Sequence, residues 1–475
     1  MKLHNSLTKQ TEDFTPIAPP KVGLYTCGMT VYDYAHIGHG RKYVMDDILR
    51  RTLTANGYEV THVQNVTDVG HLASDGDEGE DKMEKGAAKA QKTVWEVAEF
   101  FTKNFYDTMD QLGILRPTVI CKATDHIPEQ ISLIQKLFAN VHAYDTPEAV
   151  YFDVETFPAY GELLGQSLSE KQQAVREEVQ TGSMKKHPAD FVLWFKRVGR
   201  FADHIMHWSS PWGDGFPGWH IECSAMSMKY LGDQFDIHTG GEDHLPVHHP
   251  NEIAQSEGAT NKHPFVKVWM HYSHLLVDGR KMSKSLGNFY TIDDVKAKEI
   301  DPLALRYFYL TAHYSKHMNF TWEALEASQS ALTKLQEIVA SLIHTESTDQ
   351  RTTLSPEKME KIQVFGNRFM EAMNNDLNTP QALAVVWEMV KSNIPESDKR
   401  DLLYTFDEIL GFGLIHIKEK KREDIPEEVV SLLTKREEAR HNKQFDEADN
   451  LRKQIESAGY DVFDTPSGAK LSLKM

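Results

Sequence analysis

The stretch from residue 22 to residue 66 most constrains how this 475-residue chain can fold. Val22–Cys27 (VGLYTC) is a short apolar run rich in strand-forming residues, and Tyr58–Val66 alternates as a strand does. Between them, the run Gly40–Asn56 has helical spacing, and Gly57 ends it. Because strand, loop, helix and strand in this order begin a doubly wound α/β fold, we expect a Rossmann-like parallel sheet.

The remaining segments indicate how this sheet is completed and extended. Strand-like runs return at Gln234–His238 and Phe265–Met270, after an irregular, proline-containing region. Beyond Ala304 the pattern is nearly all helical, and it ends in a charged helix and two short possible strands. We therefore expect a catalytic domain in two halves with an insertion, a helical bundle and a small C-terminal α+β domain. Their predicted ranges are 1–118 and 213–300 for the halves, 119–212 for the insertion, 301–425 for the bundle and 426–475 for the last domain.

Composition excludes some classes of protein and limits others. No run of about 18 apolar residues is present, so we expect no membrane-spanning helix. Three cysteines and an N-terminus without an apolar signal segment favour a reducing, cytoplasmic location. A net charge of −18 argues by itself against nucleic-acid binding, since phosphate contacts need Lys and Arg, although a large acidic protein can still hold one basic face.

The loop after the first predicted strand has features of an anion site. It reads His36-Ile37-Gly38-His39 and lies where a helix N-terminus would direct free N–H groups at a phosphate. Gly38 allows the backbone to approach a ligand closely, and both imidazoles can donate hydrogen bonds to phosphate oxygens. Two ordinary loop histidines would give the same string, so this motif alone leaves both interpretations open.

A second cationic cluster, KMSKS, occupies Lys281–Ser285. A solvated basic loop is the usual meaning of so short a charge run. Taken together and in this order, however, the two clusters resemble the paired ATP signatures of class I aminoacyl-tRNA synthetases. The resemblance implies that ATP, accompanied by Mg²⁺, is bound by both clusters while a carboxylate attacks the α-phosphorus. The residues implied to bind ATP are His36, His39, Lys281, Ser283 and Lys284, and all except Ser283 are implied to stabilise the transition state.

A set of possible metal ligands is also present. Cys27, Cys223, His248 and Glu252 are residue types that zinc accepts in four-coordinate sites. His248 and Glu252 are four residues apart, so one face of a helix could present both. No CxxC pair occurs, and taken singly these residues are better explained as buried cysteines and an ordinary loop histidine.

Two longer segments, residues 25–41 and 216–256, resemble cysteinyl-tRNA synthetases, and further matches extend over nearly the whole chain. This resemblance implies one zinc ion per chain on Cys27, Cys223, His248 and Glu252. It also implies that Trp219 closes over the amino acid, with a core tryptophan as the alternative, and that Thr67 and Asp243 hold its ammonium group. The full implied substrate pocket is Gly28, Thr30, Thr67, Trp219, His220, His238 and Asp243.

Two departures from the family pattern affect these expectations. Pro250 replaces a glutamate inside the string that carries His248 and Glu252, so the helical argument holds only if the helix starts at or before this segment. The stretch after Thr67 and Asp68 is longer and more acidic than is usual, and the sequence indicates no role for residues 74–86.

The expected function is ATP-dependent ligation of L-cysteine to tRNA(Cys) through a cysteinyl adenylate, by a cytoplasmic monomer without a membrane partner. Zinc would select the substrate thiolate, because serine and cysteine are too similar in size for shape alone to separate them. Segments 300–310, 374–383 and 436–460 resemble the family's tRNA-contacting regions. Three alternatives remain open: a cysteine–amino-sugar ligase of the mycothiol type, a nucleotidyltransferase with an HxGH loop, and a non-catalytic tRNA-binding relative.

Overall fold

The structure is a computed structural model of the 475-residue chain, and it divides into two compact units. The first unit contains residues 1–322 and 371–380, and the second contains residues 323–370 and 381–475. The residues described are 1–69, 81–165, 184–283, 286–344, 355–418, 426–465 and 468–473. The finer division into five segments stays a prediction.

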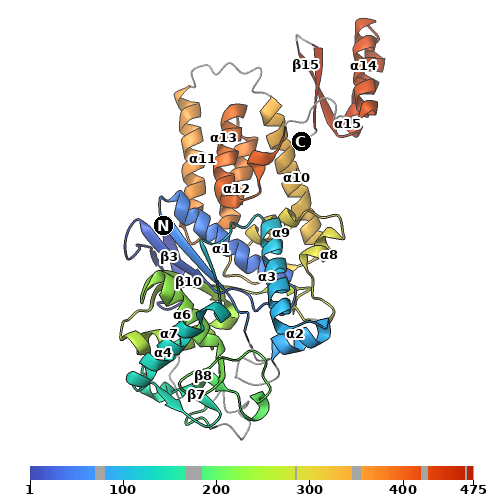
Figure 1. The fold of residues 1–475 in the computed structure, drawn as a ribbon. Helices are drawn as coiled ribbons and strands as arrows, with labels where there is room; N and C mark the ends of the chain where they lie inside the picture. The colour runs from blue at the N-terminus through green and yellow to red at the C-terminus, as the bar shows by residue number, and fades with distance from the viewer. Residues whose placement is uncertain are drawn as a thin grey trace. The chain divides into compact units, whose positions relative to one another are not determined.

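A five-stranded parallel sheet forms the centre of the first unit (Figure 1). In spatial order its strands are β11 (Val266–Tyr272), β10 (Phe235–Gly241), β3 (Lys21–Thr26), β4 (Glu59–Val66) and β5 (Val119–Lys122). From β3 at the centre, β4 and β5 follow on one side, and β10 and β11 follow later on the other side. This is the doubly wound arrangement predicted. The strand order reverses between β3 and β10, and ligands of such sheets bind at the carboxyl ends of the strands on either side of that point.

Helices cover both faces of this sheet (Figure 1). One side carries α1 (Ile37–Ala55) and α3 (Val94–Gln111), and the other carries α4 (Ile127–Ala139), α6 (Trp219–Leu231) and α7 (His248–Thr260). Helix α1 buries Val44, Ile48 and Leu53 completely, as its spacing predicts. It begins at Ile37 rather than at Gly40, because the side chain of His36 caps it.

The predicted insertion, residues 119–212, divides between two sheets. Its first strand, β5, pairs in parallel with β4 and so belongs to the central sheet. A separate antiparallel sheet follows, in the order β6 (Ala143–Asp145), β7 (Ala149–Phe152), β8 (Phe191–Lys196) and β9 (Gly215–Pro217). The short β5 was not recognised as a sheet strand because it buries only Cys121 among its four residues, which is too weak a pattern.

Helix α2 (Lys82–Ala90) begins at the end of the acidic stretch, of which residues up to 80 lie outside the described part of the chain. Asp81 accepts hydrogen bonds from the backbone N–H groups of Met83 and Glu84 through Oδ1. Its Oδ2 lies 2.8 Å from Nε2 of the buried His204, in the segment that joins β8 to β9. The end of the acidic stretch therefore has a structural role, as a helix cap attached to the insertion.

Two smaller sheets complete the first unit. The chain starts with an unpredicted hairpin of β1 (Lys2–Asn5) and β2 (Gln10–Asp13). Strand β12 (Leu275–Val277) pairs with β13 (Arg280–Lys281) and with β14 (Met318–Phe320), so the region after Ala304 is not wholly helical. The two short helices between these strands are α8 (Ile292–Lys296) and α9 (Pro302–Leu310).

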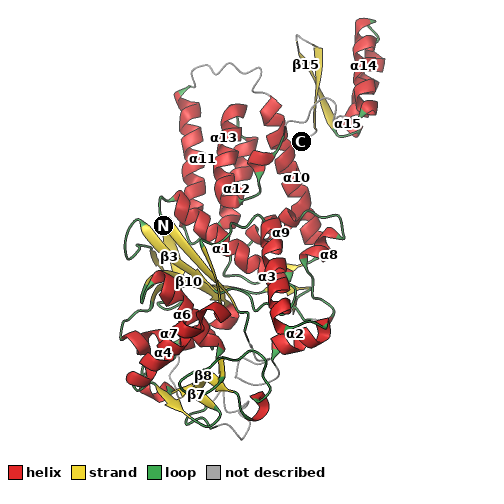
Figure 2. Cartoon of the chain, viewed as in Figure 1, coloured by secondary structure: helices red, strands yellow, loops and turns green. Residues whose placement is uncertain are grey.

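The chain from residue 322 onward is mostly helical, as predicted (Figure 2). Its first four helices are α10 (Trp322–His344), α11 (Pro356–Asn374), α12 (Thr379–Lys391) and α13 (Glu396–Leu410). The last segment contains α14 (Glu427–His441), α15 (Phe445–Ser457) and a hairpin of β15 (Tyr460–Thr465) and β16 (Gly468–Leu473). Val429, Leu433, Ile455 and Val462 form its buried core.

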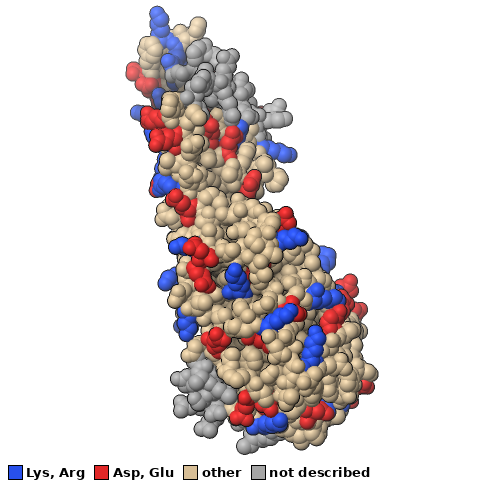
Figure 3. Space-filling view, turned by 90° about the vertical axis from the view of Figure 1, so that its left-hand side faces the viewer, with Lys and Arg blue, Asp and Glu red and all other residues tan. Residues whose placement is uncertain are grey.

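Helix hydropathy and the distribution of charged side chains can both be compared with the composition. Among the described residues, no helix is both long and apolar enough to cross a lipid bilayer. On the face that Figure 3 shows, lysine and arginine side chains are interspersed with aspartate and glutamate. The net charge of −18 is thus not expressed on this face as one continuous acidic surface.

Candidate metal centre and nucleotide loops

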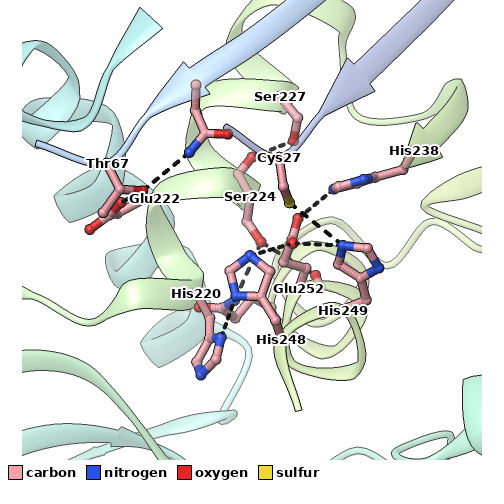
Figure 4. A network of polar contacts seen from close by, with 12 residues as sticks. Cys27, Thr67, His220, Glu222, Ser224, Ser227, His238, His248, His249 and Glu252 are labelled. Atoms are coloured by element: carbon pink, nitrogen blue, oxygen red, sulfur yellow. Dashed lines mark hydrogen bonds and ion pairs between the residues drawn. The ribbon is translucent and has the colours of Figure 1, made fainter. Parts of the chain in front are cut away.

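A buried cluster of metal-ligating side chains lies where the strand order reverses (Figure 4). Cys27 directly follows β3, Cys223 lies on α6, and His248 and Glu252 lie on α7. Their ligand atoms are all within 4.8 Å of one another, and none of the four side chains is exposed. The structure thus brings together the four residues predicted to hold zinc.

The geometry of α7 explains how Pro250 is accommodated. The helix begins at His248, so Pro250 is its third residue, where a missing N–H group leaves no helical hydrogen bond unmade. His248 and Glu252 are then one turn apart, with Nε2 and Oε1 separated by 3.0 Å. The helix therefore begins early enough for Pro250 to be tolerated and for His248 and Glu252 to lie on one face.

Further histidines orient the proposed ligands. Nε2 of His238 is 3.0 Å from Oε2 of Glu252, and Nδ1 of His220 is 2.8 Å from Nδ1 of His248 (Figure 4). The ring of Trp219 stacks on His248, with centroids 4.1 Å apart. Such outer contacts fix which nitrogen of a ligating imidazole faces a metal.

The electrostatics of the cluster suit a cation. Burial raises the pKa of the Cys27 thiol, but the hydrogen bond with Cys223 and the nearby His244 outweigh it and hold that pKa well below its usual range. The hydrogen bond with Cys27, together with burial, raises the pKa of Cys223 well above its usual value. Burial opposes a charge on His248, yet Glu252 and Cys27 raise its pKa to about 10. Because the pKa values of Cys223 and His248 are raised, zinc binding would have to displace a proton from each.

The donor set fits zinc in its chemistry. Two thiols, an imidazole and a carboxylate, all buried and convergent, match the ligand types of four-coordinate zinc sites. An overlapping group of Cys27, His238, His249 and Glu252 is equally compact. Because both groups contain Cys27 and Glu252, the cluster has more donors than one ion requires.

The predicted substrate pocket lies partly beside this cluster. Thr30 and Thr67 pair as neighbouring extended residues, and a Cβ on Gly28 would lie only 1.6 Å from the carbonyl oxygen of Asn65. Only glycine can therefore occupy position 28 in this backbone arrangement. Thr67 is buried, whereas Asp243 is exposed on the turn Glu242–His244 at the end of β10. The two residues predicted to share the substrate ammonium thus have different surroundings.

Three further residues near the cluster were not identified as candidate site residues from the sequence. Glu222 is fully buried beside Thr67, and burial, only partly offset by the hydrogen bond from Thr67, raises its pKa well above its usual range. Asn65 connects Gly28 to Thr67 by hydrogen bonds. His244 lies beside Trp219 and His248. A charged residue next to Cys223 and a further histidine in the GGEDHLP string were the available signals.

The loop His36–His39, whose sequence is HIGH and which we call the HIGH loop, caps helix α1 through both of its histidines. The backbone N–H of His39 donates to Nδ1 of His36 at 3.2 Å, and the backbone N–H of His36 donates to Nδ1 of His39 at 3.3 Å. The two rings stack with centroids 3.6 Å apart. Because both Nδ1 atoms accept, each neutral ring carries its hydrogen on Nε2. A Cβ on Gly38 would lie 2.9 Å from the His36 ring, so this packing requires glycine.

The segment that contains KMSKS packs against the HIGH loop within the same unit. The backbone N–H of Ile37 donates to the carbonyl oxygen of Tyr290 at 2.9 Å, and Phe289 lies edge-on to the ring of His36. Lys281 is exposed on β13, and Met282 reaches to 3.6 Å from the position that a Cβ on Gly38 would take. Lys284 and Ser285 lie outside the described residues.

Comparison with known families identifies the chain. A family model described as the catalytic domain of class I (C) tRNA synthetases matches residues 13–330. A DALR domain model matches residues 368–393, and a model of the cysteinyl-tRNA ligase anticodon binding domain matches residues 422–469. The chain belongs to the cysteine–tRNA ligase family. It is therefore an enzyme of the ligase class, as the sequence predicts.

Relatives and solved structures agree with this assignment. The chain is 44% identical to a cysteine–tRNA ligase of Treponema denticola over 97% of its own length and 96% of the relative. It is likewise 44% identical to cysteine–tRNA ligase 1 of Burkholderia lata, over 99% and 96%. A methionyl-tRNA synthetase from Mycobacterium tuberculosis (TM-score 0.57, 14% identity, 82% of this chain and 90% of that one) shares the fold. A leucyl-tRNA synthetase from Agrobacterium radiobacter (TM-score 0.61, 12% identity, 85% of each chain) shares it too.

Proposed function

We propose that this member of the cysteine–tRNA ligase family joins L-cysteine to tRNA(Cys) through a cysteinyl adenylate and recognises cysteine with one zinc ion. The observation that carries this proposal is the buried convergence of Cys27, Cys223, His248 and Glu252 at the carboxyl end of β3. The HIGH loop follows only a few residues after Cys27, so the amino acid and ATP would meet at the same edge of the sheet.

Zinc is proposed as the element that separates cysteine from serine. When bound, it supplies a Lewis-acid centre that takes a thiolate readily and a neutral hydroxyl poorly. The protein's part is to hold the four donors in a fixed, water-poor arrangement, with His220 and His238 orienting His248 and Glu252. A pocket built around a partner that only one substrate satisfies can reject the other by roughly 10⁴- to 10⁵-fold, which removes the need for editing.

Phosphoryl chemistry is proposed for the two ATP clusters. The cysteine carboxylate attacks the α-phosphorus and pyrophosphate leaves; the terminal ribose hydroxyl of the tRNA then takes the cysteinyl group and AMP leaves. With their Nδ1 atoms accepting within the loop, His36 and His39 can turn Nε2–H donors toward phosphate oxygens. Lys281, Ser283 and Lys284 would contact the phosphates from the second loop, and Mg²⁺ would accompany ATP.

The remaining pocket residues are proposed from the family pattern. The floor would be Gly28 and Thr30, with Thr67 and Asp243 at the ammonium group. Trp219 stacks on His248 and could cover the bound amino acid from that position. The predictions of a monomer and of a cytoplasmic location stay predictions.

The tRNA partner is supported by the C-terminal segment. Its match to an anticodon binding domain weighs against the alternative of a cysteine–amino-sugar ligase, which would have no use for one. Of the basic residues singled out there, Arg436 is buried and cannot meet RNA at the surface, whereas the others lie on exposed positions of α14 and α15 or the turn between them. These exposed residues are Arg440, Lys443, Arg452 and Lys453.

One set of measurements tests the proposal. Zinc content, cysteine-dependent ATP–pyrophosphate exchange and transfer of cysteine to tRNA(Cys) are measured on the full chain, with serine in parallel. We expect about one zinc per chain, exchange with cysteine alone and transfer to tRNA. Exchange by metal-free protein that still rejects serine would refute the role of zinc, and exchange without transfer to tRNA would favour the amino-sugar ligase.

A further inference from the structure

A closed ring of polar contacts joins Cys27 to helix α1 and strand β10. Nζ of Lys42 donates to the carbonyl oxygen of Cys27 at 2.5 Å and lies 2.8 Å from Oδ2 of Asp46. The hydroxyl of Thr239 donates to Oδ1 of Asp46 at 2.6 Å, and its carbonyl oxygen accepts from the backbone N–H of Cys27 at 3.3 Å. These four residues, which we call the Lys42 ring, hold both backbone polar groups of Cys27.

The Lys42 ring is largely shielded from water. Cys27, Asp46 and Thr239 are at most 3% exposed, and the side chain of Lys42 is 14% exposed. Burial raises the pKa of Asp46, and the Lys42 ammonium and the hydrogen bond from Thr239 offset this only in part. A carboxyl group without these partners would be unfavourable at so buried a position, so Asp46 ties Lys42 to Thr239.

An ordinary ion pair on a helix surface does not explain these contacts. Lys103 and Asp107 on α3 form such a pair at the same spacing of four residues, and their side chains are 77% and 48% exposed. Exposed pairs of this kind contribute little to stability. Lys42 instead reaches from its helix to the backbone of the residue that follows β3, so its hydrogen bond connects two segments of the fold.

The position of Lys42 relates the metal cluster to the HIGH loop. Cys27 is a proposed zinc ligand, and His39 lies three residues before Lys42, on the same side of α1. Along the chain, residues 28–35 separate Cys27 from the HIGH loop. The hydrogen bond from Lys42 to Cys27 closes this segment, because it joins residues on either side of it. The contact thereby limits how far the sulfur-binding position can move from the loop proposed to hold ATP.

We propose that Lys42 is a positioning residue that holds the zinc ligand Cys27 in register with the HIGH loop, so that bound cysteine and ATP meet in a reactive geometry. Asp46 and Thr239 fix the Lys42 side chain for this task. The inference rests on the proposed function, because it concerns how two substrates of that reaction are brought together. Lys42 acts through the backbone of Cys27 and contacts neither substrate.

The variant Lys42→Met tests the proposal, because methionine keeps a long, flexible side chain but cannot donate. Cysteine-dependent ATP–pyrophosphate exchange is measured on the zinc-loaded full chain. We expect kcat to fall roughly 10- to 100-fold, with KM for ATP changed much less, because the reacting groups are misaligned and not lost. Lys103→Met is the matched control and should leave exchange unchanged, since it breaks the exposed pair on α3. An unchanged kcat in Lys42→Met would overturn the inference.

Cobalt provides a readout that does not depend on catalysis. Co²⁺ is used in place of zinc because its visible absorption reports the geometry of a four-coordinate site. For Lys42→Met we expect a changed absorption spectrum and a Kd for Co²⁺ raised roughly tenfold, since the backbone that carries Cys27 is less constrained. A role confined to stability would lower the melting temperature and leave both the cobalt spectrum and kcat unchanged, which would contradict the proposal.

A second variant tests whether the four residues act as one ring. Thr239→Val removes the hydroxyl that holds Asp46 and should lower kcat less than Lys42→Met does. The double variant should lose hardly more than Lys42→Met alone, because the ring is already open, whereas losses that multiply would contradict the ring. If Lys42→Met does not fold, a loss of kcat in Thr239→Val but not in Lys103→Met supports the proposal, and equal rates refute it. Absence of exchange in the unaltered protein would instead count against the proposed function.

Discussion

The metal cluster and the nucleotide loops both join residues far apart in the sequence, but the metal cluster is buried whereas the nucleotide loops are partly exposed. Cys27, Cys223, His248 and Glu252 are at most 3% exposed, and histidines behind them orient the ligands. The HIGH loop is half-buried, and Lys281 on the opposing loop is exposed. Recognition of one sulfur atom needs donors set in advance in a dry site, whereas a triphosphate has to enter and leave from solvent.

The same contrast appears in the local chemistry. In the metal cluster, side chains from α6, α7 and the residue that follows β3 meet one another, so the arrangement depends on three elements being in place. In the HIGH loop, the two histidines cap their own helix and stack on each other, so the arrangement is largely local. Perturbing the first should therefore affect selectivity and metal content, and perturbing the second should affect rate alone.

The largest effect is expected from Cys223→Ser. Loss of one soft, buried donor should abolish stoichiometric zinc and lower cysteine-dependent exchange by about 10³-fold or more, while the fold is largely kept. Zinc content by mass spectrometry and exchange with cysteine and serine measure this. Cys121→Ser is the matched control, since Cys121 is buried in β5 outside the cluster. Normal cysteine activation by the Cys223 variant would contradict the zinc role.

The next largest effect is expected from His39→Ala in the nucleotide loop. Removal of a donor aimed at developing phosphate charge should slow adenylate formation by roughly 10²- to 10³-fold. Zinc content and the calorimetric affinity for cysteine should stay unchanged, because the ring stacks on His36 in the loop and is not one of the clustered ligands. Pre-steady-state adenylate formation is the measurement. Lys284→Ala should behave in the same manner, and an unchanged rate in both variants would remove these residues from the mechanism.

Zinc affinity should depend steeply on pH. In the metal-free protein the pKa of His248 is raised to about 10 and that of Cys223 is raised above its usual value, so zinc has to displace both protons near neutrality. Affinity should therefore rise with pH, by up to about 100-fold per unit while both groups hold protons. Competition with a chromophoric chelator between about pH 6 and pH 8 measures this.

The nucleotide loop provides the contrast in that experiment. Burial, with the nearby His36 and Lys42, lowers the pKa of His39 well below its usual range, so its ring stays neutral over the same interval. Titration of His39 should then contribute nothing to the pH dependence of exchange between about pH 6 and pH 8.

A zinc affinity that does not change with pH would contradict the protonation of His248 and Cys223 in the metal-free protein.

The smallest effect is expected from Gly38→Ala. The added Cβ would meet the His36 ring at 2.9 Å, so the ring has to move and the mutual cap is disturbed. We expect about a tenfold slower exchange with normal zinc content. Gly366→Ala is the control, because no described atom outside the backbone of its own helix lies within 4 Å of its added Cβ. It should leave activity unchanged and stabilise α11 by up to about 1 kcal/mol. Equal exchange rates in both variants would mean that the stacked histidines are not needed.

Much of the architecture was predictable from local patterns. Strand, loop, helix and strand between residues 22 and 66 gave the doubly wound sheet, because alternation and helical spacing report burial directly. The strand β5 was not assigned to that sheet, since it is short and exposes Ile120, and only pairing with β4 defines it. The ligand types at Cys27, Cys223, His248 and Glu252 were likewise evident in advance through family resemblance.

What the amino-acid sequence determined by itself was the set of elements, the two phosphate-binding strings and the ligand types, because each is a property of neighbouring residues. Only the tertiary structure decided that Glu222 shares a buried hydrogen-bond chain with Asn65 and Thr67. It also decided that Asp243 is exposed while Thr67 is not. These contacts depend on which strand ends and helix faces pack together. Burial then fixes the hydrogen-bond donors and acceptors, because water cannot compete for them.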